Sequence, residues 1–412
     1  MTIITSKGIR SFFKGVGEFL AKDTLKSSFS SIVFVTGNES ADLDSCVSSI
    51  ITAYLYSIDQ GQESQTTPLV LPLINTPRED LNLRPDITYL LKTTGIATAS
   101  LTFIDDLLPL KKTPSTPSPK TFLVDHNKLQ GPTREIFGTN VIGIIDHHDD
   151  EQAYKIDGST GPRIIERTGS CSSLVVNYFS AKLSSTVFET DKDLALLALG
   201  PLLADTSNMT SRVEEFDTKS YEILTHALGY TAADVTAFYH TLDRYKKDVS
   251  SLTGAEILRK DYKEWVPESH TTDEEAHENS IPGKIGISSV VKSLAWLYNT
   301  HKSFEDDIKQ WAQRRQLDFF AVMSSYVEDS ENAHGNFCRD ILLFVPPTAT
   351  QTSKDKLQEV IKEVTGPLEL EPLDLKVSEG FYAFRQRNLK SSRKQVAPLL
   401  KFHIQGVAMN SL

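Results

Sequence analysis

Aspartate and histidine residues follow four apolar runs of this sequence, and both residue types bind divalent metal ions. The motifs are Asp42-Leu43-Asp44, Asp125-His126-Asn127, Asp146-His147-His148 and Asp205-Thr206, which follow the apolar runs 31–36, 122–124, 141–145 and the apolar segment ending at Leu203. A single aspartate in such a place usually serves in a turn or caps a helix. Four of them without neighbouring cations predict one shared site instead.

The chemistry that such a group performs is metal-dependent hydrolysis at phosphorus. Several carboxylates at one site repel one another unless metal ions compensate their charge. Aspartate and histidine together suit Mg²⁺, Mn²⁺, Co²⁺ or Zn²⁺. About five ligands exceed the needs of one catalytic ion, so we expect two ions, roughly 3.5–4 Å apart and bridged by a carboxylate. Such a pair generates hydroxide near neutral pH and neutralises phosphoryl oxygens.

The elements that must position these residues alternate between short apolar runs and helical patterns, which predicts a parallel sheet covered by helices. The expected strands are 31–36, 69–74, 101–104, 122–124 and 141–145, and the expected helices are 45–56, 81–94, 172–183 and 192–203. We expect Ser45 to cap the first of these helices. In such a sheet, ligands bind at the carboxyl ends of the strands, where the motifs would lie.

A second domain is expected because the composition changes near residue 210. Its expected strands are 285–288, 318–324, 341–345 and 401–405. The predicted fold class is α/β, with an N-terminal doubly wound, mostly parallel sheet in residues 1–215, a connecting region at 216–234 and a smaller α/β domain in residues 235–412. We expect the active site in the cleft between the two domains. The stretches 111–120 and 273–278 are expected to be exposed loops.

The overall composition is that of a globular protein, and the 412 residues carry a net charge of -11. An acidic chain repels polyanions unless cations gather locally, so no nucleic acid is expected as a partner. No run approaches the ~18 apolar residues that span a bilayer, so no membrane partner is expected. The three cysteines share no disulfide or metal-site spacing, which favours a reducing compartment.

The amphipathic segment from Ile9 to Leu25 is expected to be a docked surface helix, because acidic residues interrupt its basic face. The alternative is a mitochondrial presequence. We therefore expect a cytoplasmic monomer, with a mitochondrial pool as the alternative location.

The four motifs, in this order, resemble those of the Asp-His-His (DHH) phosphoesterase superfamily. The resemblance implies that two divalent cations, Mg²⁺ or Mn²⁺ with Co²⁺ or Zn²⁺ as alternatives, bind to one set of ligands, namely Asp42, Asp44, Asp125, His147 and Asp205. Asp125 would bridge the two ions and so take part in catalysis.

The same resemblance assigns roles to the neighbours of these ligands. His148 would face the substrate phosphate and act in catalysis, while Asp146 would support the site without binding metal. Asn38 stands where many members have histidine, so one metal site is expected to be looser, and we count Asn38 among the substrate-binding residues. His126 is either a substrate contact or a buried, hydrogen-bonded histidine; both alternatives stay open.

A basic segment interrupts the acidic background from Arg385 to Lys394. A solvated loop or a nucleic-acid patch would also account for it. However, Ser392-Arg393-Lys394-Gln395 resembles the phosphate-binding motif in the second domain of family II pyrophosphatases, and residues 259–263 resemble the start of that domain. The resemblance implies that several cations contact the substrate, namely Lys263, Arg385, Arg387, Arg393 and Lys394.

The first motif, the Asp125-His126-Asn127 triplet and the chain length resemble most the fungal cytosolic exopolyphosphatases. The implied reaction is release of terminal orthophosphate from inorganic polyphosphate. A prune-like phosphodiesterase acting on cyclic nucleotides or short polyphosphates, and an inorganic pyrophosphatase, are the enzymatic alternatives. A non-enzymatic scaffold is disfavoured because a decayed site would have lost at least one carboxylate.

Overall fold

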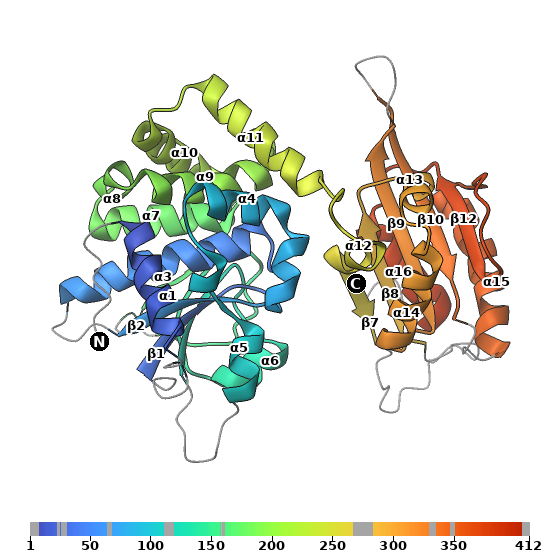
Figure 1. Cartoon of the computed structure of the whole chain (residues 1–412), viewed down its shortest axis with the longest axis horizontal. Helices are drawn as coiled ribbons and strands as arrows, with labels where there is room; N and C mark the ends of the chain where they lie inside the picture. The colour runs from blue at the N-terminus through green and yellow to red at the C-terminus, as the bar shows by residue number, and fades with distance from the viewer. Residues whose placement is uncertain are drawn as a thin grey trace. The chain divides into compact units, whose positions relative to one another are not determined.

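The structure of this chain is a computed structural model, and it describes residues 8–22, 25, 31–63, 68–110, 119–156, 158, 161–266, 283–328, 335–346 and 351–405. The chain forms two compact units, Met1–Asp248 and Val249–Leu412. Figure 1 shows a sheet with helices in each unit.

The first unit contains a six-stranded sheet in the order β3-β2-β1-β4-β5-β6, in which every pair of neighbouring strands is parallel. The strands are β1 (Ile32–Thr36), β2 (Leu69–Ile74), β3 (Thr102–Phe103), β4 (Lys120–Val124), β5 (Val141–Asp146) and β6 (Arg163–Ile165). The first five confirm the expected strands. Because the chain leaves β1 toward one side of the sheet and β4 toward the other, a crevice forms at their carboxyl ends, as in other doubly wound sheets.

Helices cover both faces of this sheet. Phe34 of β1 packs against Phe137 of α6 (Gly131–Phe137), and Phe122 of β4 packs against Tyr56 of α3 (Leu43–Glu63). Phe122 pairs with Val35, the residue after Phe34, so the side chains of Phe34 and Phe122 lie on opposite faces of the sheet. The doubly wound arrangement expected from the sequence is therefore confirmed.

The remaining helices of the first unit are α1 (Ile9–Leu20), α4 (Pro85–Thr93), α5 (Ile104–Leu107), α7 (Cys171–Leu183), α8 (Thr186–Thr190), α9 (Lys192–Asp205), α10 (Glu215–Leu228) and α11 (Ala232–Lys247). Helix α1 is the docked helix expected from the sequence, because Phe12, Phe13 and Val16 are buried in the core. It contacts α3 and α9.

The division between the units falls later than the sequence suggested, because α10 and α11 belong to the first unit. Helix α10 packs on α7 and α9, and α11 packs on α4 and α9. Tyr245 of α11 stacks on Tyr89 of α4 with ring centroids 4.3 Å apart. The region 216–234, expected to connect two domains, is therefore mostly helix packed on the first unit.

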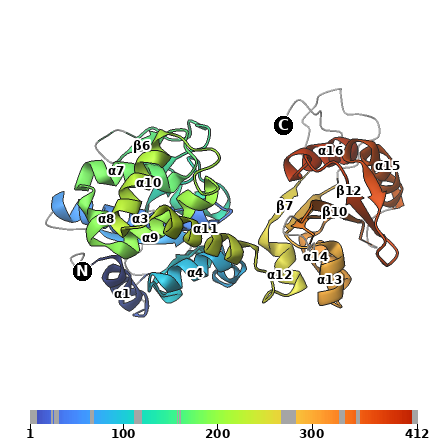
Figure 2. The same cartoon turned by 90° about the horizontal axis from the view of Figure 1, so that it is seen from above.

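The second unit contains a mixed six-stranded sheet in the order β11-β12-β10-β9-β8-β7. Its elements are α12 (Gly254–Lys260), β7 (Tyr262–Trp265), β8 (Ile285–Val290), α13 (Leu294–Thr300), α14 (Phe304–Arg315), β9 (Phe319–Val327), β10 (Phe337–Phe344), α15 (Gln351–Leu368), β11 (Leu370–Pro372), β12 (Phe381–Gln386) and α16 (Arg393–Gln405). Only β8 and β9 pair in parallel. Figure 2 shows α15 and α16 on one face of this sheet and α12 to α14 on the other.

The expected strand at 401–405 is wrong, because these residues form the last turns of α16. Lys401-Phe402-His403-Ile404-Gln405 alternates like a strand, but Val396, Leu400 and Ile404 recur at the helical spacing and are buried. A capping box begins this helix, since the backbone N–H and the hydroxyl of Ser392 donate to Oε1 of Gln395, 3.0 and 2.8 Å away.

Three further expectations concern the surface and the cysteines. Cys46, Cys171 and Cys338 are free and buried, in agreement with the absence of a disulfide framework. Within the described ranges, no helix combines the length and the apolar character needed to cross a bilayer. The expected loops at 111–118 and 273–278 lie outside the described residues.

Candidate metal centre

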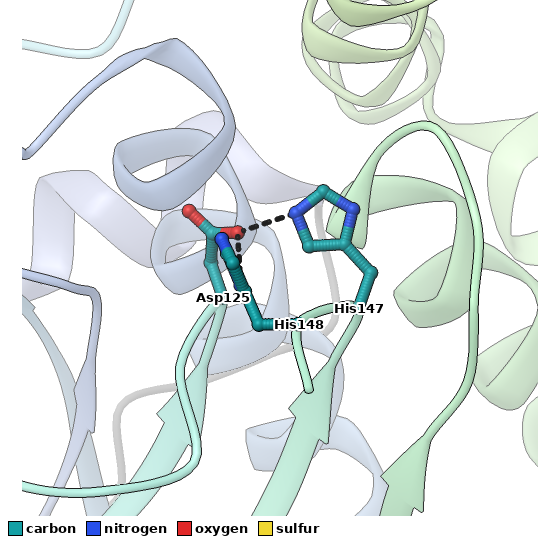
Figure 3. Close-up of side chains that lie close together, drawn as sticks. All are labelled: Asp125, His147 and His148. Carbon is teal, nitrogen blue, oxygen red and sulfur yellow. Dashed lines mark ion pairs between the residues drawn. The ribbon is translucent and has the colours of Figure 1, made fainter. Parts of the chain in front are cut away.

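Three motif residues from two neighbouring segments meet at the carboxyl end of the first sheet. Asp125 follows β4 directly, and His147 and His148 follow β5. Figure 3 shows both imidazole rings turned toward the carboxylate of Asp125. The two contacts are His147 Nε2 at 3.0 Å and His148 Nδ1 at 3.8 Å, each measured to Oδ1 of Asp125. These atoms are close enough to one another to ligate a single ion.

Asp125 is held rigidly in an unusual backbone conformation. Its φ of 61° lies in the left-handed region, and its N–H donates to the carbonyl of Ile145 at 3.1 Å. Oδ2 accepts a hydrogen bond from Nδ2 of Asn38 at 2.8 Å. Oδ1 is buried and accepts no hydrogen bond from any described residue. A buried carboxylate oxygen without a donor is costly, and a metal ion would satisfy it.

His147 has the hydrogen-bonding pattern of a metal ligand. Its Nδ1 lies 3.1 Å from the carbonyl oxygen of Thr168, so Nδ1 carries the proton. Nε2 is then the free ring nitrogen, and it faces Oδ1 of Asp125. Burial lowers the pKa of His147, but contact with Asp125 outweighs this effect and raises the pKa to about 10. The contact with Asp125 favours a proton on Nε2, between the two groups. A metal cation can take the position of this proton.

His148 is oriented differently, although it is adjacent in sequence. Its Nδ1 lies 2.8 Å from Oδ1 of the buried Asp146, which also accepts the backbone N–H groups of His147 and His148. The contact with Asp146 raises the pKa of His148. With 55% of its side chain exposed and Nδ1 engaged, His148 is left with Nε2 to contact another molecule.

Asp44 and Asp42 each serve the end of a helix in addition to the role expected for them. Asp44 is buried and accepts four hydrogen bonds. One comes from Ser48 Oγ of α3, and three come from Ser170 Oγ, Cys171 N and Ser172 N at the first turn of α7. Its Oδ2 lies 4.0 Å from His147 Nε2. The carboxylate thus joins α3 to α7 and keeps one oxygen directed toward the cluster.

Asp42, not Ser45, caps α3, which corrects the expectation from the sequence. The N–H of Ser45 donates to Oδ1 of Asp42 at 3.0 Å, while the hydroxyl of Ser45 accepts the N–H of Asn38 at 2.7 Å. A Cβ on Gly37 would lie 2.4 Å from this hydroxyl, so the turn between β1 and α3 requires glycine. Asp42 itself is exposed.

The electrostatics of the cluster favour a bound cation. Burial raises the pKa of Asp205, at the end of α9, to about 8, and the charges of Asp44 and Asp42 add to the shift. Burial, followed by the charge of Asp44, also raises the pKa of Asp125. The carboxylates Asp42, Asp44, Asp125 and Asp205 are therefore close enough to repel one another. Carboxylate oxygens and the imidazole nitrogen of His147 are donors that suit divalent ions such as Mn²⁺ and Mg²⁺.

Two residues expected to bind substrate are used within the protein. Nδ2 of Asn38 donates to Oδ2 and to the carbonyl of Asp125, while its Oδ1 accepts from the N–H and hydroxyl of Ser40. Asn38 therefore supports Asp125 and offers no free oxygen. Nδ1 of His126 lies 2.9 Å from the carbonyl of Val124, while Nε2 is buried without a hydrogen bond from a described residue, so both alternatives for His126 stay predictions.

In the second unit, a cavity of about 550 Å³ gathers cations at the first turns of α16. Five basic side chains line it, namely Lys263, Arg339, Arg393, Lys394 and Lys401. Arg393 donates from Nη2 to Oδ1 of Asp261 at 2.7 Å and from Nη1 to its carbonyl at 2.8 Å. The sequence motif at 392–395 therefore brings Arg393 and Lys394 together with Lys263, as expected.

Arg385 and Arg387, also expected to bind substrate, do not line this cavity. Arg385 lies in β12, where its Nε is 2.8 Å from Oδ1 of the buried Asp340. Arg387 forms an exposed ion pair with Glu371 at 2.7 Å. Carboxylates on neighbouring strands thus pair with both arginines, and their expected contact with substrate stays a prediction.

The sequence pattern did not identify the residues that hydrogen-bond to His147 and Asp44, nor two of the cations that line the cavity. Thr168, Ser170 and Ser172 precede or begin α7, and their small polar character is an N-terminal helix signal that could have been recognised. Arg339 and Lys401 carry no such signal, because each lies alone in a strand or helix pattern and reaches the cavity only through the fold.

Comparisons with known proteins agree with this geometry. The model of the DHH family, N-terminal domain, matches residues 32–200, and the model of the DHHA2 domain matches residues 240–402. A Schizosaccharomyces pombe protein named "Putative exopolyphosphatase" is 34% identical over 394 residues, which cover 93% of each chain. Rattus norvegicus "Exopolyphosphatase PRUNE1" is 27% identical over 89% of this chain and 74% of its own length.

More distant matches agree as well. An Archaeoglobus fulgidus protein named "Probable manganese-dependent inorganic pyrophosphatase" is 25% identical over 57% of this chain and 67% of its own length. The solved structure of a Methanococcus jannaschii "putative family II inorganic pyrophosphatase" has a TM-score of 0.51 at 18% identity, covering 90% of this chain and 99% of that one. This second likeness concerns the fold alone.

Proposed function

Because this chain belongs to the DHH phosphoesterase family and is a hydrolase of phosphoanhydride bonds, we propose that it is an exopolyphosphatase that removes terminal orthophosphate from inorganic polyphosphate. The 34% identity to the Schizosaccharomyces pombe protein, over 93% of both chains, supports this substrate. The free, buried cysteines are consistent with the cytoplasmic location that we expect.

The observation that carries the proposal is the pair formed by Asp125 and His147. A carboxylate oxygen and the outer nitrogen of an imidazole lie 3.0 Å apart in a buried, acidic environment. Without metal a proton on Nε2 compensates this carboxylate, and a metal ion bound by both atoms would take the place of that proton. We propose that two divalent cations, Mg²⁺ or Mn²⁺, bind there.

We propose that the five residues expected from the sequence hold these ions. Asp125 and His147 belong to a group of ligand atoms that could share one ion, and Asp42, Asp44 and Asp205 add carboxylates whose charges act on one another there. When bound, the ions would supply a nucleophilic hydroxide and neutralise phosphoryl oxygens. The hydrogen bonds to α7, Thr168 and Asn38 hold Asp44, His147 and Asp125 in place, so little reorganisation is needed when metal and substrate bind.

His148 would act on the substrate. Because Asp146 accepts the proton of Nδ1, the imidazolium form of His148 presents the N–H of Nε2 to another molecule. The contact with Asp146 raises the pKa of His148 and so favours this form. We propose that this N–H donates to a phosphoryl oxygen or to the leaving oxygen as the phosphoanhydride bond breaks.

The cations that line the cavity of the second unit would bind phosphate groups of polyphosphate. Lys263 and Lys394 are exposed and form no ion pair with a described residue, so both are available to phosphate. Arg393 is positioned by Asp261 and has 18% of its side chain exposed. A group of cations within a protein of net charge -11 has a clear use only if an anion binds there.

The experiment that tests this proposal measures phosphate release from long polyphosphate, pyrophosphate and cyclic AMP, each with Mg²⁺ and with Mn²⁺. The expected result is rapid orthophosphate release from long polyphosphate with at least one of the ions and none in EDTA. Preference for pyrophosphate would identify a pyrophosphatase, and hydrolysis of cyclic AMP would identify a prune-like phosphodiesterase. Absence of turnover on all three would contradict an enzymatic role.

A further inference from the structure

Lys401 is a buried lysine without a partner among the described residues. It lies on α16 with 9% of its surface exposed, and it lines the basic cavity. It forms no hydrogen bond or ion pair with any residue that the structure describes. Lysine is almost never buried to this extent unless an anion compensates its charge, because removing an ammonium group from water is costly.

Among the residues that the structure describes, the cavity lining contains no free carboxylate that could compensate this charge. Asp261 is the acidic residue among the described residues that line it, and Arg393 engages both its Oδ1 and its carbonyl. The other charged groups of the lining are the cations Lys263, Arg339 and Lys394, which add to the positive potential around Lys401. No described residue of the lining therefore compensates the charge of Lys401, and an anionic ligand would do so.

The floor of the cavity is extended, because it crosses four neighbouring strands. Lys263 of β7, Ser289 of β8, Ser325 of β9 and Arg339 of β10 all line it. The strand registers place these residues on one face of the sheet, the face whose apolar part packs beneath α15 and α16. Three steps between neighbouring strands span about 14 Å.

The cavity also extends along helix α16. Arg393 and Lys394 lie in its first turn, and Lys401 lies about two turns later, so their backbones are separated by about 12 Å along the helix axis. All three side chains line the same cavity. The volume of about 550 Å³ is that of a small-molecule site, and it greatly exceeds the room needed by a single phosphoryl group.

We propose that Lys401 binds a phosphoryl group beyond those held by Arg393 and Lys394, so that the cavity selects chains of three or more phosphoryl groups over pyrophosphate. This assignment rests on the proposed function and names the residue that gives that site its preference for longer chains. Pyrophosphate, whose two phosphorus atoms share one oxygen, would be held by the residues of the first turn. A third phosphoryl group would reach Lys401.

The test is equilibrium binding of tripolyphosphate and of pyrophosphate to the full chain by calorimetry in EDTA, where hydrolysis does not interfere. Lys401→Met, which keeps the length of the side chain, should weaken tripolyphosphate binding about tenfold or more and pyrophosphate binding less than about twofold. Lys401→Arg, which keeps the charge, should bind tripolyphosphate nearly as the parent does. Lys362→Met is the matched control, because Lys362 is exposed on α15 and does not line the cavity.

Equal weakening of both ligands, an unchanged tripolyphosphate affinity in Lys401→Met, or no tripolyphosphate binding by the parent would overturn the assignment. Should Lys401→Met fail to fold, Lys401→Gln serves the same comparison, with thermal unfolding as the check on structure. Orthophosphate release by the parent with metal tests the proposed function separately. A parent that hydrolyses polyphosphate while Lys401→Met binds tripolyphosphate normally would exclude only the role of Lys401.

Discussion

Oδ1 of Asp125 lies 3.0 Å from Nε2 of His147. This oxygen is buried away from water and accepts no conventional hydrogen bond from a described residue. The two residues follow β4 and β5, which are neighbours in the sheet. Asn38 holds the other oxygen of Asp125, and Thr168 holds the other nitrogen of His147. The two free atoms are therefore aimed at one point, which is the arrangement that a shared metal ion needs.

Replacing Asp125 by asparagine should remove metal and activity together. The substitution keeps the shape of the side chain but loses the charge that compensates the ions, so we expect kcat to fall on the order of 10²-fold or more. Bound metal, measured by elemental analysis, should fall in parallel. Asp149→Asn, an exposed carboxylate in the same loop region, is the control. Near-normal metal content in Asp125→Asn would refute the assignment of Asp125 as a ligand.

Replacing His148 by glutamine should separate catalysis from metal binding. Nδ1 of His148 is occupied by Asp146, so the ring is available to substrate through Nε2 and is not needed to hold metal. We expect kcat to fall on the order of 10²-fold with bound metal unchanged. Asp146→Asn should lower kcat about 10–100-fold by releasing the ring. Loss of metal in His148→Gln would show that the roles of the two histidines are reversed.

Replacing Lys394 by methionine should impair the binding of long polyphosphate specifically. Lys394 lines the basic cavity, so its loss should raise KM for long chains roughly tenfold with little change in kcat. The dependence of KM on salt should become weaker than in the parent, because fewer ionic contacts form. Lys390→Met provides a control, since Lys390 belongs to the same basic segment but lies outside the cavity lining. Equal effects of the two substitutions would argue for a diffuse charge effect.

The metal-free protein should lose stability as the pH rises. Burial raises the pKa of Asp205 from 3.8 to about 8, so ionisation of this group opposes folding increasingly across that interval. Burial lowers the pKa of His147, but contact with Asp125 outweighs this effect and raises the pKa from 6.5 to about 10. The positive charge of His147 therefore stabilises the folded protein fully below pH 6.5, and this stabilisation is lost as the pH rises toward 10. Both groups act in the same direction.

The measurement is the unfolding temperature in EDTA and in Mn²⁺ as a function of pH. In EDTA, it should fall by more than ~4 °C between about pH 5 and pH 9. Saturating Mn²⁺ should raise the unfolding temperature and reduce this slope, because the ions compensate the carboxylates that burial and repulsion penalise. An unfolding temperature in EDTA that rises with pH would show that the acidic cluster is not the dominant titrating group.

The sequence predicts the first sheet well because its strands are continuous apolar runs that end in polar motifs. The run at 69–74 matches β2 at both ends, and each motif lies where its strand or helix ends. The order of the strands then brings Asp125 next to His147. The hydrogen bonds of Asp44 to α7 were not predictable, because residues separated by more than a hundred positions form them.

The second unit was predicted less well because its signals are local and ambiguous. Lys401 to Gln405 alternates like a strand but belongs to a helix whose capping residue, Ser392, lies nine positions before Lys401. Arg385 and Arg387 appear as free cations in the sequence, yet Asp340 and Glu371 on adjacent strands pair with them. Only strand register, which the sequence pattern does not specify, distinguishes these arginines from the cations that line the cavity.

The most direct test of the account is the length distribution of the products early in the hydrolysis of long polyphosphate by the metal-loaded parent chain. If the chain is an exopolyphosphatase, orthophosphate accumulates from the first time point as the small product, and the remaining polymers shorten from their ends. Mid-length fragments appearing before orthophosphate would contradict this account, because they would mean that internal bonds are cleaved.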